Sequence, residues 1–202
     1  MIDWFLDRSG VVSVYNAESW QRVLFAELEA QMTSDARPFP CVYGVAGFKH
    51  DNLRFCFLDE IGQQTLGPVL EKYLSQARSN GRNASLVVFE RPAPVQHLED
   101  YRDRFWGLLD GLASRDKAPW PTDIPQEMND PEWEFCYANE PIFVVCNTPA
   151  HVQRQSRRST GFMVTLQPRW VFDGITDTEN KAATAFGNVR QRLRTFDPAF
   201  PR

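Results

Sequence analysis

Residues 133–158 read WEFCYANEPIFVVCNTPAHVQRQSRR, and this stretch carries the strongest fold signal in the chain. It contains two apolar segments suited to β-strands, residues 133–137 and residues 141–145. Asn139 and Glu140 separate the two segments, which favours a tight hairpin. We therefore predict an antiparallel pair of strands here.

The end of the same stretch carries side chains that a structural hairpin does not need. Cys146 ends the second strand, and His151, Arg154, Arg157 and Arg158 follow it closely. Imidazole and thiolate groups bind metals, and a guanidinium fork matches a carboxylate. The i, i+3, i+4 spacing of the arginines predicts that one helical turn would place all three on one side. We predict a metal or haem-iron site with an anion bound beside it; the structural alternatives are a solvated basic face and a small core thiol.

The rest of the chain mixes helices and strands without a regular βαβ rhythm. Apolar runs predict four more strands, at Cys41–Val45, Leu53–Leu58, Ser85–Glu90 and Phe162–Leu166. Helices are expected at residues 17–34, 66–79, 97–114 and 177–195, with a surface loop at 117–131. This order favours an α+β fold with a central mixed or mostly antiparallel sheet of about six strands packed with helices.

Two of these helices show which faces they should bury. Apolar residues at helical spacing predict the buried stripe of the 17–34 helix: Trp20, Val23, Leu24, Leu28 and Met32. The same argument turns one face of the 177–195 helix inward: Ala182, Ala185, Phe186, Val189 and Leu193. We expect the tail from Phe196 onward to be loose.

Length and composition limit the class of protein. With 202 residues, we expect a single domain over residues 1–202 with its core at about residues 17–195. The net charge of -4 argues against nucleic-acid binding, which usually needs a basic face. No apolar run is long enough to cross a bilayer and the start of the chain lacks a signal peptide, so we expect a cytoplasmic protein.

Several common functional motifs are absent from the sequence. No CxxC pair occurs among the four cysteines, which argues against a structural zinc site. GxGxxG, P-loop, HExxH and GxSxG motifs are also absent, which lowers the odds of a nucleotide-binding protein, a zinc protease or a simple hydrolase. The chemistry is therefore expected in the 133–158 stretch.

An ordered series of motifs over about residues 17–195 resembles the YqcI/YcgG family. The series consists of FPC at 39–41, LRF at 53–55, SLVVFE at 85–90, FW at 105–106, KAPWPTDIP at 117–125, WEFCYANEPIFVVCNTPAH at 133–151, RQSRR at 154–158 and QPRWVFD at 167–173. Some members of that family look like haem-dependent N-oxygenases that hydroxylate guanidine nitrogens, as in arginine N-hydroxylation.

The resemblance implies haem b as the cofactor, and an oxidoreductase that hydroxylates a guanidino or amino nitrogen of an arginine-like small molecule. It also implies dioxygen or peroxide as the oxidant. Because the 202 residues include no reductase segment, electrons are expected from an external donor. The alternative is a non-catalytic protein that binds or senses haem or another small ligand. A homo-oligomer is compatible with either interpretation.

The residues of the expected haem site follow from their chemistry. His151 is the first choice as iron ligand because it lies beside the arginines, and Cys146 and Cys41 are the thiolate alternatives. Glu134 or Glu140 is expected to hold the cationic substrate. The aromatic walls and the clamp for propionates or a substrate acid are expected from Phe39, Trp106, Trp133, Arg154, Arg157 and Arg158.

Overall fold

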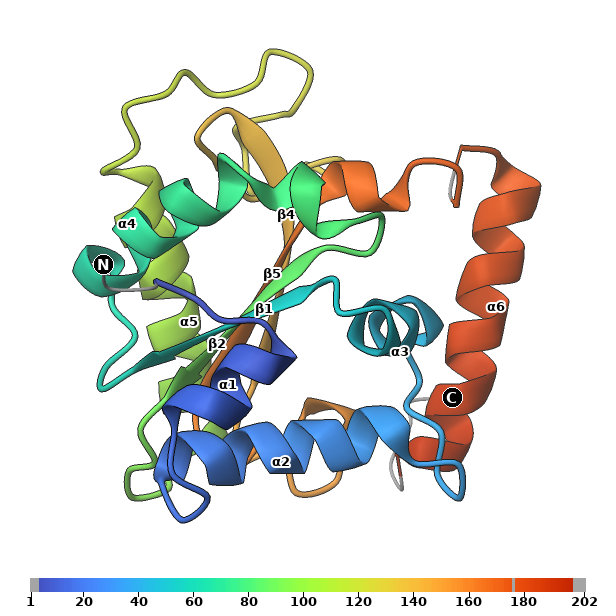
Figure 1. The fold of residues 1–202 in the computed structure, drawn as a ribbon. Coiled ribbons are helices and arrows are strands. Elements are labelled where there is room, and N and C mark those ends of the chain that lie inside the picture. The colour runs from blue at the N-terminus through green and yellow to red at the C-terminus, as the bar shows by residue number, and fades with distance from the viewer. Residues whose placement is uncertain (1–3, 176, 198–202) are drawn as a thin grey trace.

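A five-stranded mixed sheet forms the centre of the molecule (Figure 1). The computed structural model describes residues 4–175 and 177–197. The strand order is β1-β2-β5-β4-β3, in which β1 and β2 are parallel and every other neighbouring pair is antiparallel. The strands are β1 (Leu53–Leu58), β2 (Ser85–Glu90), β3 (Cys136–Tyr137), β4 (Glu140–Asn147) and β5 (Met163–Pro168).

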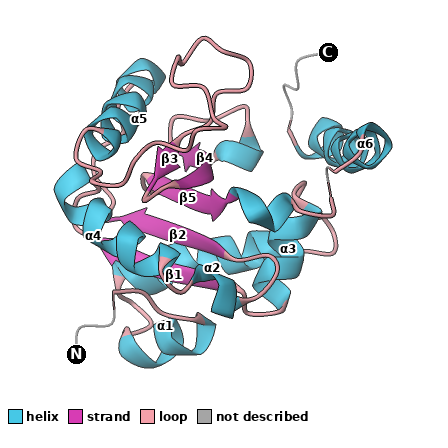
Figure 2. Ribbon diagram, turned by 90° about the horizontal axis from the view of Figure 1, so that it is seen from above, coloured by secondary structure: helices cyan, strands magenta, loops and turns pink. Residues whose placement is uncertain are grey.

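Helices cover both faces of this sheet, as the view from above shows (Figure 2). None of the helices in the described part of the chain is long and apolar enough to span a bilayer. The α-helices are α1 (Arg8–Val14), α2 (Trp20–Thr33), α3 (Val42–Lys49), α4 (Gln63–Leu74), α5 (Leu98–Ala113) and α6 (Glu179–Phe196). Three short 3-10 turns are η1 (Ala77–Asn80), η2 (Gln155–Arg157) and η3 (Arg169–Phe172).

The predicted single-domain α+β fold is confirmed, with one strand fewer than expected among the described residues. The segment Cys41–Val45, predicted to be extended, instead forms the start of helix α3. Cys41 itself is extended, and its Sγ accepts a hydrogen bond from the Gly44 N–H as a helix cap. A short apolar run has no periodicity that separates a strand from a buried helix, which is why the prediction was wrong.

The predicted hairpin is confirmed and turns one residue earlier than expected. Tyr137 and Glu140 face each other across the hairpin, so Ala138 and Asn139 form a two-residue loop. Both loop residues have positive φ values, 54° and 61°, as a type I′ turn requires. Beyond this short β3, the Ile142 N–H of β4 still donates to the Phe135 carbonyl, and Thr148 just after β4 forms an isolated bridge with Arg158. No further strand pairs with the outer side of β4 within the described residues.

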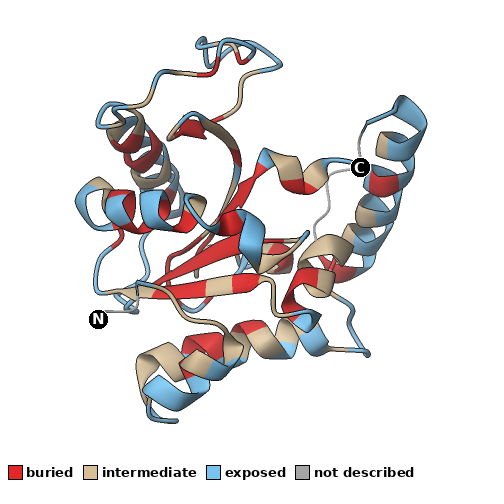
Figure 3. Ribbon diagram, turned by 45° about the horizontal axis from the view of Figure 1, so that its top comes forward, coloured by how far each residue is buried: buried red, intermediate tan, exposed pale blue. Residues whose placement is uncertain are grey.

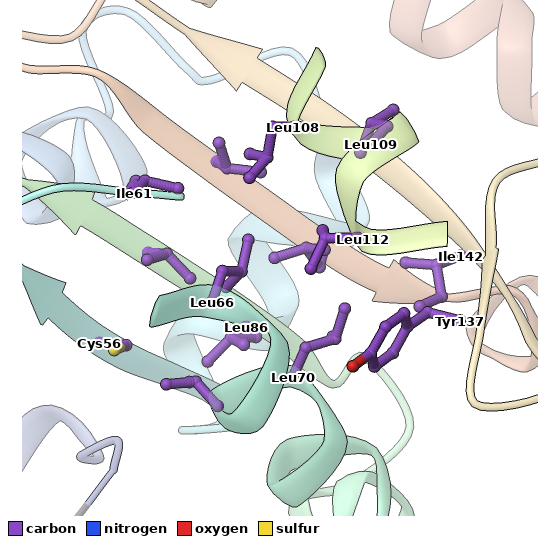
Figure 4. Packing of buried hydrophobic residues seen from close by; sticks show 14 of the residues in the cluster. Cys56, Ile61, Leu66, Leu70, Leu86, Leu108, Leu109, Leu112, Tyr137 and Ile142 are labelled. Carbon is purple, nitrogen blue, oxygen red and sulfur yellow. The ribbon is translucent and has the colours of Figure 1, made fainter. Parts of the chain in front are cut away.

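One face of the sheet is packed tightly against α4 and α5 (Figure 4). Side chains alternate between the two faces along a strand, so Leu86, Val88 and Leu166 all point to this side. Leu70 of α4 and Leu112 of α5 meet them, and all five are at most 1% exposed. This cluster is the main hydrophobic core.

The opposite face is covered by α1, α2 and α3 over β1 and β2. Phe55, Val87 and Phe89 point to this side and pack against α2, where Phe25 is 1% exposed. The predicted stripe of α2 is therefore rotated: Val23, expected inside, is 53% exposed, and Phe25 takes its place. Figure 3 shows the buried strands between these two layers of helices.

Helix α6 stands apart from the sheet along most of its length and is anchored at its C-terminal end (Figure 1). The buried Asp197 accepts hydrogen bonds from the Ser156 N–H at 2.7 Å and the Ser156 hydroxyl at 2.6 Å. The ring of Phe196 lies against Phe39 and under the guanidinium of Arg37. The expectation of a loose tail is therefore wrong for residues 196 and 197, and residues 198–202 lie outside the described chain.

The inward face of α6 is only partly as predicted. Ala185 is buried, and Val189 and Leu193 are half-buried on the side that faces the sheet. Phe186, expected on the same face, is 51% exposed. Since α6 does not close fully onto the sheet, a cavity lies between them.

Candidate functional site: two cavities on either side of strand β4

One cavity lies between α6 and the part of the sheet that the other helices leave uncovered. We call it the sheet–α6 cavity. Its volume is about 230 Å³ and its walls are mostly apolar. Helices α2 and α3 close its remaining sides. The residues that line it are Leu28, Gln31, Met32, Phe39, Pro40, Cys41, Gly44, Leu53, Ser85, Val87, Phe143, Val145, Asn147, Ser156, Arg157, Met163, Thr165, Gln167, Val189 and Leu193.

Three predicted site residues, Phe39, Cys41 and Arg157, line this cavity. Pro40 keeps the segment extended up to the start of α3, so the Cys41 thiol stands at the first turn of that helix. The Cys41 Sγ lies 3.3 Å from the Gly44 nitrogen that donates to it. The thiol therefore lies at the N-terminus of α3 and faces the cavity.

A second cavity, which we call the His151 pocket, lies on the other face of β4. Because neighbouring residues of a strand point to opposite faces, Cys146 lines this pocket while Val145 and Asn147 line the sheet–α6 cavity. Its volume is about 350 Å³, within the range of small-molecule sites. The residues that line it are Leu98, Tyr101, Arg102, Phe105, Cys146, Thr148, His151, Arg154 and Arg157.

His151 is held in place by the turn that follows β4. Its Nδ1 lies 2.9 Å from the hydroxyl oxygen of Thr148, and its backbone N–H donates to the Thr148 carbonyl. Burial lowers the pKa of His151, and the positive charges of Arg157 and Arg154 lower it further. The imidazole is therefore neutral at neutral pH, with Nε2 left for another partner.

The three predicted arginines do not act as one clamp. Arg154 and Arg157 both line the His151 pocket, whereas Arg158 lines a small crevice on the α2 side. The reason is that this segment forms the 3-10 turn η2 rather than an α-helix. With three residues per turn, positions i and i+3 lie on the same side and position i+4 does not.

Arg157 lines both cavities. Burial lowers the pKa of Arg157, and the neighbouring charge of Arg154 adds to this effect. Among the described residues its guanidinium forms no ion pair and donates no hydrogen bond. The charge of Asp197 acts in the opposite direction on this pKa. A half-buried cation without an ion-pair partner is nevertheless costly, so this position suits an anionic ligand.

The thiol of Cys146 is a weak candidate for a free thiolate. Burial raises the pKa of Cys146 to about 12, although Arg157 and Arg104 act in the opposite direction. Burial likewise raises the pKa of Cys56, in the packed core, to about 12. Both side chains are therefore neutral thiols at neutral pH. In the described part of the chain, no group of three or more histidine, cysteine or acidic side chains is arranged to hold a metal ion.

The two predicted carboxylates lie away from both cavities. Glu134 forms an ion pair with Arg169. Glu140 begins β4, six residues and about 20 Å along the strand from Cys146. Burial raises the pKa of Glu140. Neither position supports the expectation that these carboxylates hold a substrate beside His151.

The two predicted tryptophan walls also lie elsewhere. Trp106 and Trp133 contact each other, with ring centroids 6.2 Å apart, and Trp106 is 42% exposed. Neither residue lines the sheet–α6 cavity or the His151 pocket, and the same is true of the whole loop at residues 117–131.

Sequence reasoning missed the polar side chains on the sheet face of the sheet–α6 cavity. Asn147, Thr165 and Gln167 interrupt the apolar residues of β4 and β5 on that face. It also missed the bond between Ser156 and Asp197 that closes the cavity at the end of α6. The sequence does carry a signal for the three polar strand residues, because polar residues at alternate positions of an otherwise buried strand point to one face.

The fold and the two cavities define a small α+β protein with an apolar ligand cavity next to a basic pocket. A family model for the YqcI/YcgG family matches residues 28–201 of the chain. The protein therefore belongs to the YqcI/YcgG family. No solved structure matches the chain.

Three relatives align with most of this chain. It is 39% identical over 193 residues to "Uncharacterized protein YcgG" of Bacillus subtilis (strain 168), covering 89% of this chain and 74% of that protein. It is 40% identical over 191 residues to "Uncharacterized protein YqcI" of the same organism, covering 88% of this chain and 73% of that protein. It is 26% identical over 188 residues to "Putative N(omega)-hydroxy-L-arginine synthase DcsA" of Streptomyces lavendulae, covering 88% of this chain and 70% of that protein.

Proposed function

We propose that this protein is an N-oxygenase that adds one oxygen atom to a guanidino or amino nitrogen of a small molecule, with haem b as its cofactor. The name of the Streptomyces lavendulae relative supports the reaction class. The observation that carries the proposal is the sheet–α6 cavity, which combines apolar walls with a thiol and an unpaired guanidinium.

The residues of this cavity fit haem in three chemical respects, but helix α6 would have to move outward to admit a group of that size, because the cavity volume is about 230 Å³. A porphyrin needs apolar walls, and Phe39, Val87 and Leu193 are among those present. Iron needs a sulfur or nitrogen ligand, and the thiol of Cys41 faces the cavity. Propionates need a cation, and Arg157 lines the same cavity without an ion-pair partner in the described chain.

Cys41 is the residue that we propose to bind the iron, in place of our first choice from the sequence, His151. It lies in the apolar cavity, and the Gly44 N–H already donates to its sulfur. A coordinating thiol is deprotonated by the metal itself. Haem with a thiolate ligand supplies the activation of dioxygen or peroxide that N-oxygenation needs, because electron donation from sulfur favours O–O cleavage.

His151 is the alternative ligand, and its geometry also suits iron. Its imidazole is neutral, and the Thr148 hydroxyl engages Nδ1 so that Nε2 is left for the metal. The walls of its pocket are less apolar than those of the sheet–α6 cavity, since three arginines line it. This is why we place Cys41 first.

The chain itself would bind and shield the reactants. Helix α6 covers the cavity on the side away from the sheet, so a bound group is protected from bulk water. We propose that the oxidant is peroxide, or dioxygen with electrons from an external donor. The substrate would be a small guanidino or amino compound.

Hemin titration tests the cofactor. We expect the purified protein to bind hemin in a one-to-one ratio and to give a Soret band. Cys41→Ala should shift that band and remove the ferrous–CO spectrum typical of a thiolate ligand. Cys146→Ala is the matched control, because its thiol is buried and neutral, and it should leave the spectrum unchanged. The same spectral change in His151→Ala, but not in Cys41→Ala, would indicate that the iron binds in the His151 pocket instead. Failure to bind hemin would contradict the proposed cofactor.

A product assay tests the reaction. The hemin-loaded protein is incubated with L-arginine and either peroxide or dioxygen with a reductant. We expect a product heavier than arginine by one oxygen atom, which depends on the protein and on hemin. Hemin binding without an oxygenated product from arginine or from a panel of guanidino and amino compounds would instead indicate a haem carrier or sensor.

A further inference from the structure

Arg154, which is exposed, and Arg157, which is half-buried, are two cations of the His151 pocket that form no ion pair within the described chain. Both side chains line the pocket. Within residues 4–175 and 177–197, neither guanidinium forms an ion pair or donates a hydrogen bond. They repel each other, because the charge of Arg154 contributes to the lowered pKa of Arg157. The third arginine of the pocket, Arg102, differs from them in being paired with Asp103.

The neighbouring groups offset the two positive charges only in part. The charge of Asp197 acts on Arg157 and raises its pKa, but the two carboxylate oxygens accept hydrogen bonds from the Ser156 N–H and hydroxyl and form no ion pair with either arginine in the described chain. Cys146 is a neutral thiol because burial raises its pKa to about 12. The pocket is thus a basic site that is short of one anion.

We propose that Arg154 and Arg157 bind the carboxylate of a small organic molecule in the His151 pocket. Two guanidinium forks match the two oxygens of a carboxylate. The remaining walls include Tyr101, Phe105 and Leu98, which suit the carbon skeleton of an organic acid better than a fully hydrated inorganic anion. Resting on the proposed function, the ligand class is an amino acid whose carboxylate is held here.

Arg157 can contact this ligand and, at the same time, a group bound in the sheet–α6 cavity. A guanidinium carries five N–H donors in a planar fork, so it can serve anions on two sides. Arg157 lies just past the end of β4, where its backbone carbonyl accepts a hydrogen bond from the Thr148 N–H at 3.0 Å, and its side chain borders both cavities. Arg154 lines only the His151 pocket and is therefore the position to test.

Isothermal titration of the full chain, with and without hemin, tests the proposal. The probes are L-arginine, agmatine (which lacks the carboxylate), propionate and inorganic phosphate. We expect L-arginine to bind at least about tenfold more tightly than agmatine, and Arg154→Ala to remove that difference. Arg158→Ala is the matched control: it removes the same charge from the same segment but lines another crevice, so it should leave the difference intact.

Each outcome has a defined consequence. Equal effects of Arg154→Ala and Arg158→Ala on every carboxylate probe, or no carboxylate binding at all, would overturn the proposal. Phosphate that binds as tightly as the carboxylates, with the same loss in Arg154→Ala, would also overturn it in favour of a general anion site. Propionate binding that depends on Arg154, without any binding of L-arginine, would support the carboxylate site and count against an amino-acid ligand. Carboxylate binding in the absence of hemin would support this site even if the protein proves not to bind haem.

Discussion

The two faces of the central sheet are built on the same alternating strands but are used differently. On the face covered by α4 and α5, leucine and valine side chains fill the space between the layers (Figure 4). On the opposite face, the same strands present Asn147, Thr165 and Gln167 next to apolar side chains, and α6 stands off to leave a cavity. One face is closely packed, and the other leaves a cavity.

The contrast follows from how each face is closed. The α4–α5 face is covered by helices whose buried residues interlock with the strands, as close packing requires. Helix α6 is held mainly at its C-terminal end, through Asp197 and Phe196. The cavity therefore exists because α6 is anchored at one end but is not packed against the sheet. Mutations on the two faces of the sheet should accordingly change the free energy of unfolding by different amounts.

A pair of leucine substitutions should show the largest difference between the faces. Leu166→Ala removes a fully buried side chain from the packed face, and we expect it to lower the free energy of unfolding by about 2–5 kcal/mol. Leu193→Ala removes a half-buried side chain that lines the cavity, and we expect a loss of about 1 kcal/mol or less. Urea unfolding of the hemin-free protein measures both. Equal losses would mean that α6 is packed as firmly as α4 and α5.

Thiol labelling should separate the faces by reaction rate. Because burial raises the pKa of Cys56 and Cys146 to about 12, we expect both to react with iodoacetamide at least about 100-fold more slowly than a cavity-facing thiol at mildly alkaline pH. Cys41 lines the sheet–α6 cavity and should be alkylated first. Peptide mass mapping over time gives the rates, and unfolded protein should show no such order. If Cys146 is labelled as fast as Cys41, the assignment of the two thiols to different environments is wrong.

The anchor of α6 can be broken at one residue. Asp197→Ala removes both hydrogen bonds from Ser156, and we expect a loss of about 1–3 kcal/mol in the free energy of unfolding. Hydrogen exchange should increase in α6 and in η2, while α4 and α5 keep their protection. Asp177→Ala is a control near the other end of α6, where the exposed carboxylate accepts a hydrogen bond from the Gly174 N–H at 2.6 Å and pairs with the exposed Lys181. Increased exchange in α4 as well would show that α6 and the packed face unfold together.

The packed face was more predictable from the sequence than the open one. Runs such as Ser85–Glu90 identify interior strands because apolar β-formers fill every position, and the hairpin followed from its turn residues. The segment at Cys41–Val45 was assigned to a strand because its helix is defined by a thiol cap and by tertiary packing, and neither leaves a periodic pattern in eight residues.

The sequence indicated which residues gather at the candidate site, but not how they divide between the two cavities. It placed Cys146, His151, Arg154 and Arg157 together because they follow one strand end within a few residues, and all four line one pocket. It could not show that Arg158 leaves the group, since that depends on a 3-10 turn in place of an α-helix. Nor could it show that Cys41 occupies the opposite face of the sheet, which only the three-dimensional fold decides.

The smallest effect that we expect is a pH dependence of stability from the His151 pocket. The pKa of His151 in the folded protein lies below its ordinary value of about 6.5, because the ring is buried beside Arg157 and Arg154. Below about pH 6.5 the unfolded chain therefore binds a proton that the folded chain does not, and the free energy of unfolding falls as the pH falls. The slope from this residue is at most about 1.4 kcal/mol per pH unit, and it levels off below the folded pKa.

Urea unfolding between pH 5 and pH 7.5 should show a smaller slope in His151→Asn than in the parent, whereas His97→Asn, at the exposed start of α5, should keep the parent slope. A carboxylate ligand bound by Arg154 and Arg157 would offset the two positive charges, so adding it should reduce the same slope in the parent protein. An unchanged slope in His151→Asn would mean that the pKa of His151 is not lowered in the folded protein.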